Sequence, residues 1–261
     1  MTVVALASIA GSPGVTRLAI GLAAAWPGGC ERVVIEADAD GGRLGAELGV
    51  GVEPGLMELA MAARASGLTP ASMLERGAAA IGDWWVVPAP PSAEQTSSAL
   101  AHAGAALAST MAADRSGRVW IVDAGRLSAR SPALPFARLA DHVLLVTNGT
   151  FPELQLLAHR VDSLHGAGCA VAVVVVEPTA WSAEEIADFA GADVAALVPF
   201  VRTRAHRVAS MSATPWRGWW RRVGELAALL ADGTRGADDA VATTTSSVPD
   251  TAARPAGEAQ R

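Results

Sequence analysis

Short runs of apolar, often β-branched residues recur along the chain, with stretches of helical pattern between them. The runs are continuous rather than alternating, as in strands that are covered on both faces. Strands of this kind that alternate with helices predict an α/β fold with a doubly wound, mostly parallel sheet. We expect strands at residues 3–8, 32–36, 84–88, 119–123, 142–147, 170–176 and 194–199, and helices at 16–26, 55–65, 92–113, 153–165, 182–189 and 216–231.

The extent of the folded part follows from length and composition. A chain of 261 residues that is 51% hydrophobic is long enough for one large domain. Its apolar runs fall short of the ~18 to 20 residues that a membrane-spanning helix needs. From Asp232 onward the sequence is rich in Thr, Ser, Pro and Ala without apolar periodicity, so we predict a domain over 1–231 and a disordered tail over 232–261. No basic segment precedes the first apolar run, which argues against a signal peptide and favours the cytoplasm.

A glycine-containing turn joins the first expected strand to the first expected helix. A strand, a glycine-rich turn and a helix form the context in which backbone N–H groups and a helix N-terminus hold a phosphate group. The alternative is a glycine turn that serves chain geometry alone. The residues that would bind a nucleotide phosphate here are Gly11, Ser12, Gly14, Val15, Thr16 and Arg17.

Carboxylates follow two later strands. Asp38 and Asp40 come after the strand at 32–36, and Asp123 closes the strand at 119–123 before Ala124 and Gly125. Sheets of parallel strands place their sites at these carboxyl ends. An aspartate that ends a strand in this way is typical of an acid that holds Mg²⁺ through water. The alternative for Asp38 and Asp40 is that they solvate the strand end and cap a loop.

The order of these motifs resembles the ParA/MinD family of P-loop ATPases over residues 1–231. That family includes chromosome and plasmid partition ATPases, septum-site regulators and the pilus-localising TadZ/CpaE branch. The resemblance implies a P-loop NTPase fold of the SIMIBI type, ATP or ADP with Mg²⁺ as cofactors, a partner protein and a homodimer. It also implies that Thr16 and Asp123 lie at the metal and that Asp38 is the catalytic residue that orients the attacking water.

The phosphate loop departs from the family pattern at both of its lysines. The family sequence Lys-Gly-Gly-x-Gly-Lys-Thr-Thr runs from Ala10 to Arg17 in this chain, and the two lysines fall on Ala10 and Val15. The whole chain contains no lysine. Each lost contact of this kind commonly costs about 10² to 10³ in rate, so the resemblance implies weak or lost ATPase activity. Arg17 either turns inward as a substitute cation or faces solvent.

A stretch rich in arginine lies between Asp193 and Glu225, where the chain has no acidic residue although its net charge is −6. Such a surface favours non-specific contact with DNA or another polyanion, and the alternative is a solvated helix face. The tryptophans of the same segment recur at helical spacing, which is typical of a helix that packs on the sheet or of one that lies on a membrane as a peripheral anchor. The arginines are Arg202, Arg204, Arg207, Arg217, Arg221 and Arg222.

Two functions follow from the sequence. The first is that of a ParA/MinD-like cytoplasmic protein that binds nucleotide and acts in chromosome partitioning, septum-site placement or the positioning of a pilus or secretion system. The second is a nucleotide-independent interaction module that uses the P-loop fold as a scaffold and binds a partner protein or DNA through the arginine surface between Arg202 and Arg222.

Overall fold

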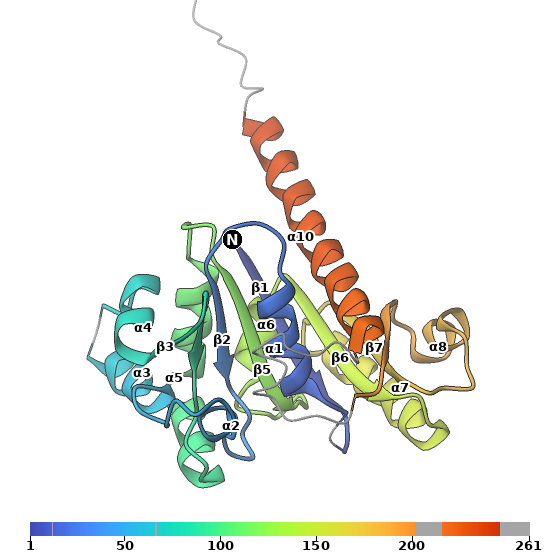
Figure 1. Ribbon diagram of the computed structural model, residues 1–261, viewed down its shortest axis with the longest axis horizontal. Helices are drawn as coiled ribbons and strands as arrows, with labels where there is room; N and C mark the ends of the chain where they lie inside the picture. Colours follow the sequence, from blue (N-terminus) through green and yellow to red (C-terminus); the bar gives the residue numbers. More distant parts are fainter. Residues whose placement is uncertain (12, 66, 202–215, 246–261) are drawn as a thin grey trace, which may run out of the picture.

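The computed structural model describes residues 1–11, 13–65, 67–201 and 216–245, with side chains described up to residue 233. Its centre is an eight-stranded sheet in the order β3-β4-β2-β5-β1-β6-β7-β8 (Figure 1). Every neighbouring pair is parallel except β3 with β4. The strands are β1 Thr2–Ser8, β2 Arg32–Glu36, β3 Ala79–Ile81, β4 Trp84–Val87, β5 Val119–Arg126, β6 His142–Asn148, β7 Val171–Glu177 and β8 Val194–Pro199.

Helices cover both faces of this sheet. The helices α1 and α10 pack on one face, and α3, α5, α6, α7 and α8 pack on the other (Figure 1). The helices are α1 Val15–Ala25, α2 Leu44–Leu48, α3 Leu56–Arg64, α4 Pro70–Gly77, α5 Ala93–Ala112, α6 Leu134–Leu139, α7 Phe151–His165, α8 Ala183–Ala190 and α10 Arg217–Thr245. The predicted doubly wound α/β fold is therefore confirmed.

Burial on both faces explains why the strands are continuously apolar. In β1, Val4 and Leu6 belong to the core beneath α1 and α10, whereas Val3, Ala5 and Ala7 belong to the core on the opposite face. Successive side chains of a strand point to opposite faces, so a central strand needs an apolar residue at every position.

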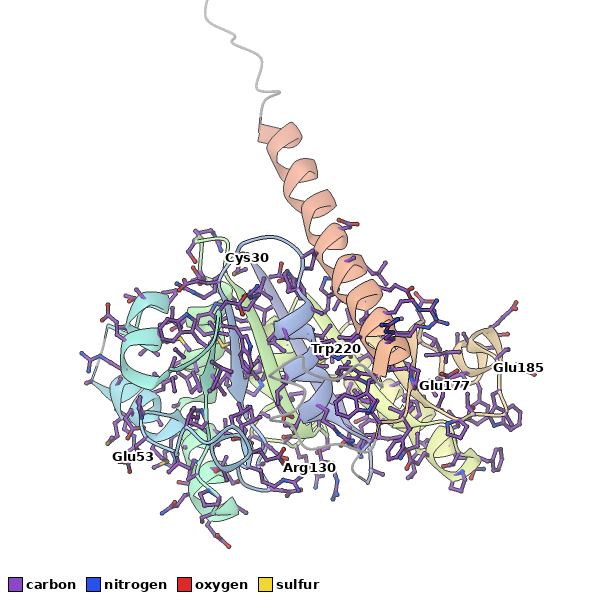
Figure 2. All side chains as sticks on the ribbon, viewed as in Figure 1. Cys30, Glu53, Arg130, Glu177, Glu185 and Trp220 are labelled. Carbon is purple, nitrogen blue, oxygen red and sulfur yellow. The ribbon has the colours of Figure 1, made fainter. Side chains whose placement is uncertain are left out.

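The tryptophan-rich helix packs on the sheet, as one of the two sequence alternatives predicts. Trp219 and Val223 of α10 are buried against α1. A Cβ atom added at Gly21 of α1 would lie 2.4 Å from Trp219, so the glycine allows the indole to approach the helix closely. Trp220, labelled in Figure 2, makes an edge-to-face contact with Trp219 at 4.9 Å between ring centroids.

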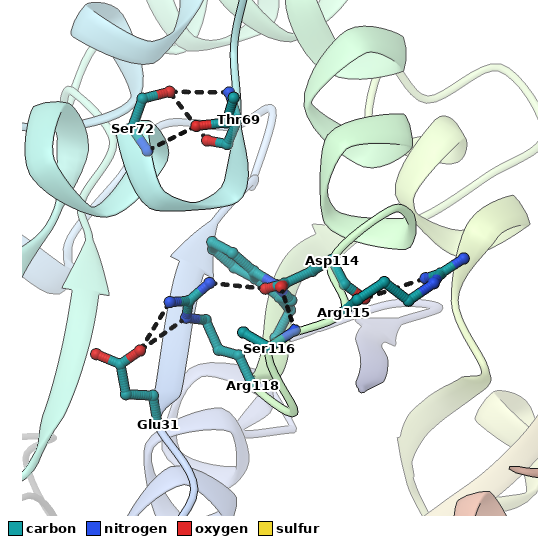
Figure 3. Close-up of polar contacts among 8 residues, drawn as sticks. Glu31, Thr69, Ser72, Asp114, Arg115, Ser116 and Arg118 are labelled. Atoms are coloured by element: carbon teal, nitrogen blue, oxygen red, sulfur yellow. Dashed lines mark hydrogen bonds and ion pairs between the residues drawn. The ribbon is translucent and has the colours of Figure 1, made fainter.

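The structure adds elements that the apolar pattern did not predict. The strand β3 and the helices α2 and α6 are three to six residues long, which is too short for a periodic pattern to emerge. The helix α4 begins at a capping box formed by Thr69 and Ser72 (Figure 3), with Pro70 at its first position. This is a local start signal that the pattern of apolar residues does not contain.

The last helix is longer than the sequence pattern indicates. We predicted a helix that ends at residue 231 and a tail that starts at Asp232, but α10 runs to Thr245. The predicted boundary therefore lies inside a helix, in a segment whose glycines and threonines have low helix propensity and gave no helical signal in the sequence. Residues 246–261 lie outside the described part of the chain. Within the described part, none of the helices is both long and apolar enough to cross a lipid bilayer.

A buried ion-pair cluster supports the amino ends of the central strands (Figure 3). Asp114 is 3% exposed and accepts hydrogen bonds from Arg118 Nη1 at 2.7 Å and from Trp120 Nε1 at 3.0 Å. Its other oxygen accepts from the backbone N–H of Ser116 at 2.9 Å. Arg118 also pairs with Glu31, which precedes β2, at 2.7 Å. The cluster thus joins β5 to the start of β2 and satisfies the indole N–H of a fully buried tryptophan.

The substitution Asp114→Asn is expected to destabilise the protein by about 3 kcal/mol at pH 7, because it leaves Arg118 buried with one carboxylate fewer. Burial raises the pKa of Asp114, but the hydrogen bonds from Ser116 and Trp120 and the charge of Arg118 outweigh it, so the net pKa is below its ordinary value. A carboxyl whose pKa is lowered in the folded protein stabilises the fold at pH values above its unfolded pKa of about 3.9. This contribution is lost as the pH falls through the folded-state pKa. Urea unfolding should therefore give the variant a lower free energy of unfolding than the natural protein, and the difference should shrink as the pH falls below about 4.

The exposed Asp162 of α7 provides the matched control, and Asp162→Asn should change the free energy of unfolding by less than about 0.5 kcal/mol. Equal effects of the two substitutions at pH 7 would contradict the role assigned to the cluster.

Candidate functional site

Two glycines with positive φ angles lie in the turn between β1 and α1, where the sequence predicts a phosphate-binding loop. Gly11 and Gly14 have φ angles of +60° and +106°, in the left-handed region that favours glycine. Gly14 is the N-cap of α1 and offers no side-chain oxygen, so no cap hydrogen bond covers the first turn of the helix. The predicted loop residues Gly11, Gly14, Val15, Thr16 and Arg17 lie together here, and Ser12 lies outside the described residues.

Thr16 and Asp123 come together behind this loop, as the sequence predicts. The Thr16 hydroxyl donates a hydrogen bond to Asp123 Oδ2 at 2.5 Å, and the Gly125 N–H donates to Oδ1 at 3.2 Å. Asp123 is 2% exposed. Its burial, opposed by the hydrogen bond from Thr16 and reinforced by the charge of Glu36, raises the pKa of Asp123 to about 7.

This pair fits the Mg²⁺ ion that the fold family implies. A hydroxyl and a carboxylate present hard oxygen ligands, and Mg²⁺ binds through one or two such groups while water and phosphate complete its shell. A cation beside Asp123 would also compensate the burial of its charge. In the described ranges, no three His, Cys, Asp or Glu side chains form a group that could hold a metal by themselves.

A second buried carboxylate, Glu36, shapes the loop after β2. Glu36 is 2% exposed, and its Oε1 accepts from the backbone N–H groups of Arg43 at 2.7 Å and Leu44 at 3.0 Å. Its Oε2 accepts from the N–H of Ala89 at 2.9 Å. Burial raises the pKa of Glu36, and these backbone hydrogen bonds lower it. The sequence analysis did not single out this residue, although it is the last residue of its strand and the first acid of a Glu-x-Asp-x-Asp series.

Asp38 lies in the same loop, two residues after the end of β2. Its Oδ1 accepts from the Asp40 N–H at 3.0 Å, so it caps a local turn, and it also faces the same cleft as Asp123. Gly125 makes this position possible, because a Cβ atom there would lie 2.0 Å from the Asp38 carboxyl carbon. Gly125 has a φ of +56°. Asp38 therefore caps a local turn and lines the cleft, and its part in catalysis stays a prediction.

These strand ends enclose a cleft of about 990 Å³. This is at the upper end of the roughly 300 to 1,000 Å³ typical of small-molecule sites. Its charged lining is mixed, with acids from the loop after β2 and from β5 and with arginines from three separate segments. The charged residues are Arg17, Asp38, Asp40, Arg43, Glu47, Asp123 and Arg126.

Arg17 is half-buried rather than directed into solvent. Its Nη1 donates to the carbonyl of Val201, and its guanidinium lies 5.8 Å from the centroid of the Phe200 ring. The side chain also packs beside Gly14, where a Cβ atom would lie 3.4 Å from Arg17 Nε. Arg17 thus lies at the β8 end of the cleft, and its part in binding phosphate stays a prediction.

The predicted polyanion surface is placed only in part. Arg217, Arg221 and Arg222 are exposed on the first turns of α10, and Arg222 pairs with Glu225 at 3.2 Å. Arg202, Arg204 and Arg207 lie outside the described residues. Binding of DNA or another polyanion at this surface therefore stays a prediction.

Comparison with known proteins identifies the fold. No protein-family model and no curated protein matches the chain. Among solved structures, it is similar to a ParA family ATPase of Chlorobium tepidum, with a TM-score of 0.72 and 15% identity over 87% of this chain and 97% of that one. It is also similar to MinD of Pyrococcus horikoshii, a septum site-determining protein complexed with Mg-ADP, with a TM-score of 0.63 and 15% identity over 95% of this chain and 99% of that one. A McdA variant of Cyanothece in complex with ATP has a TM-score of 0.62 and 18% identity over 87% of this chain and 96% of that one. The chain has the fold of the ParA/MinD P-loop ATPases.

The substitution Gly125→Ala should cost about 2 to 4 kcal/mol in the free energy of unfolding, because it adds a clash with Asp38 to the strain of a positive φ. Gly28→Ala is the matched control: Gly28 has a φ of +87° but nothing within 4 Å of the added Cβ, so its cost should be only about 1 kcal/mol. Urea unfolding of both variants measures the difference. Equal losses in the free energy of unfolding would contradict the close contact between the Asp38 carboxyl and Gly125.

Proposed function

We propose that this chain is a nucleotide-binding protein that holds ATP or ADP together with Mg²⁺ and hydrolyses ATP slowly or not at all. The observation that carries the proposal is the contact between Thr16 and Asp123 behind a glycine turn, at a cleft of about 990 Å³. Two proteins of the same fold support it, since one binds Mg-ADP and the other binds ATP.

Each residue of the site has a distinct part in this proposal. The backbone of the turn between Gly11 and Thr16 binds the phosphates, since the first N–H groups of a helix and its dipole favour an anion. Thr16 and Asp123 hold Mg²⁺, which supplies charge compensation to the phosphates when bound. Asp38 accepts a hydrogen bond from the water that attacks the terminal phosphate.

Slow hydrolysis follows from the composition of the loop. Phosphoryl transfer depends on fixed positive groups around the transferred phosphate. Ala10 and Val15 supply none, and the chain has no lysine elsewhere to replace them. The resting nucleotide complex is therefore expected to be long-lived compared with that of an ATPase that has both lysines.

The biological role that suits such a protein is the positioning of other molecules in the cytoplasm. A long-lived nucleotide complex on a ParA/MinD fold would present a surface to a partner protein, with or without a second copy of the chain. The processes that we propose are chromosome partitioning, septum-site placement or the positioning of a pilus or secretion system.

One observation favours a second candidate function. Arg217, Arg221 and Arg222 are exposed together at the start of α10, which gives this helix a basic face that could bind a polyanion without any nucleotide. Under this candidate, substitutions at Thr16 and Asp123 leave partner or DNA binding unchanged, whereas replacing the three arginines abolishes it.

Calorimetric titration with Mg-ATP and Mg-ADP tests the first candidate. Saturable binding is expected for the natural protein, and Asp123→Asn should weaken it by at least about tenfold, because the metal loses a charged ligand. The exposed Asp188 of α8 supplies the control, and Asp188→Asn should bind like the natural protein. Absence of heat and of a thermal shift at millimolar nucleotide would refute the proposal.

A further inference from the structure

Arg126 occupies a central place at the cleft. It is the last residue of β5, which lies between β2 and β1 in the sheet. The register of the sheet pairs Arg126 with Ser8, the residue at which β1 ends and the phosphate loop begins. Arg126 therefore stands between the phosphate loop on one side and the loop that carries Asp38 on the other, and it lines the cleft with both.

The arginines of the cleft differ in what their side chains already bind. The Arg17 guanidinium donates to the Val201 carbonyl and lies over the Phe200 ring. In contrast, the side chains of Arg43 and Arg126 are exposed, and neither makes a hydrogen bond or ion pair with the described residues. Of these two, Arg126 is the one whose strand pairs with the end of β1. An arginine has five N–H donors, so Arg126 can engage a ligand without giving up a contact with the described residues.

The charges around Arg126 indicate what it can attract. Burial raises the pKa of Asp38, and the charges of Arg43 and Arg126 are both close enough to lower it. The charge of Arg126 also acts on Arg160, whose guanidinium donates to the Leu127 carbonyl. Arg126 thus lies near both an acid and a second cation, and an anionic group that enters the cleft would meet a positive charge there.

We propose that Arg126 is the cation that contacts the terminal phosphate of a bound nucleoside triphosphate, in place of the lysines absent from the loop. This inference rests on the proposed nucleotide site. The neighbourhood of Asp38 places Arg126 at the end of the cleft where the attacking water and the last phosphate meet. The planar guanidinium can bind two phosphate oxygens at once. A diphosphate would lack the group that Arg126 contacts, so Arg126 also distinguishes the two nucleotides.

The test measures the affinities of Mg-ATP, Mg-ADP and Mg-tripolyphosphate by calorimetry for the natural protein and its variants. Arg126→Ala should weaken ATP and tripolyphosphate by about tenfold or more while ADP changes by less than about threefold. Arg126→Lys should recover part of the loss, since it keeps the charge without the bidentate geometry. Arg130→Ala is the matched control, because Arg130 (Figure 2) is exposed four residues further along the chain and does not line the cleft.

The outcomes separate this inference from the proposed function. ATP binding that Arg126→Ala leaves intact overturns the inference and preserves the nucleotide site. A loss of ATP affinity in Arg17→Ala or Arg43→Ala, with none in Arg126→Ala, would assign the role to that arginine instead. Tripolyphosphate binding that depends on Arg126, with no gain from adenosine, supports the contact between Arg126 and the terminal phosphate but overturns the nucleotide as ligand. Failure of the natural protein to bind any of the three probes overturns both.

Unfolding midpoints measured without ligand provide the check on folding. The Arg126 side chain is exposed, so the free energies of unfolding of Arg126→Ala and Arg130→Ala should lie within about 0.5 kcal/mol of that of the natural protein. A loss of triphosphate affinity at unchanged stability then reports on the cleft and not on the fold.

Discussion

The burial of negative charge at the carboxyl ends of β2 and β5 is the constraint around which this molecule is organised. Glu36 and Asp123 are each 2% exposed; burial raises the pKa of both carboxyls, and the charge of Glu36 raises that of Asp123 further. The fold compensates these groups in different ways. Three backbone N–H groups donate to Glu36, which fixes a loop, whereas Asp123 receives one hydroxyl and one N–H from the described residues; the pKa of both carboxyls stays raised, that of Asp123 to about 7. The second acid is therefore the one that a bound cation would stabilise.

Local sequence determines much of the fold and part of the site. The strands of the sheet follow the apolar runs closely, because a strand buried on both faces leaves no room for a polar residue. Thr16 and Asp123 meet because β1 and β5 are adjacent and parallel: Thr16 lies in the first turn of the helix that follows β1, and Asp123 lies near the carboxyl end of β5. The role of Glu36 could not be predicted in the same way, since its partner Ala89 is 53 residues away in the chain. The same holds for Gly125, because part of its need for a hydrogen in place of a side chain comes from Asp38, in the loop after β2.

The absence of lysine changes how positive charge is distributed in this fold. A loop lysine brings its ammonium group to the phosphates from within the loop itself. Arginines that come from α1, from the loop after β2 and from β5 surround the same space here, and they differ in whether a carbonyl or ring already engages them. Arginine stays charged at any physiological pH and fixes the orientation of an anion more strictly than lysine does. In the proposed nucleotide complex, a cleft of this type favours holding the triphosphate in one geometry over hydrolysing it rapidly.

The packing of Trp219 on Gly21 has a mechanical consequence. The helix α1 carries the phosphate loop at its first residue, and α10 is pressed against its side with no space for independent sliding. From Trp219, α10 runs to Gly233, which lies beside His142 at the amino end of β6. At about 1.5 Å per residue, that segment is a rod of roughly 20 Å. Because Val223, Leu226 and Leu230 of α10 are buried in the same core as α1, the two helices form one packed unit that links the turn after β1 to the amino ends of the strands.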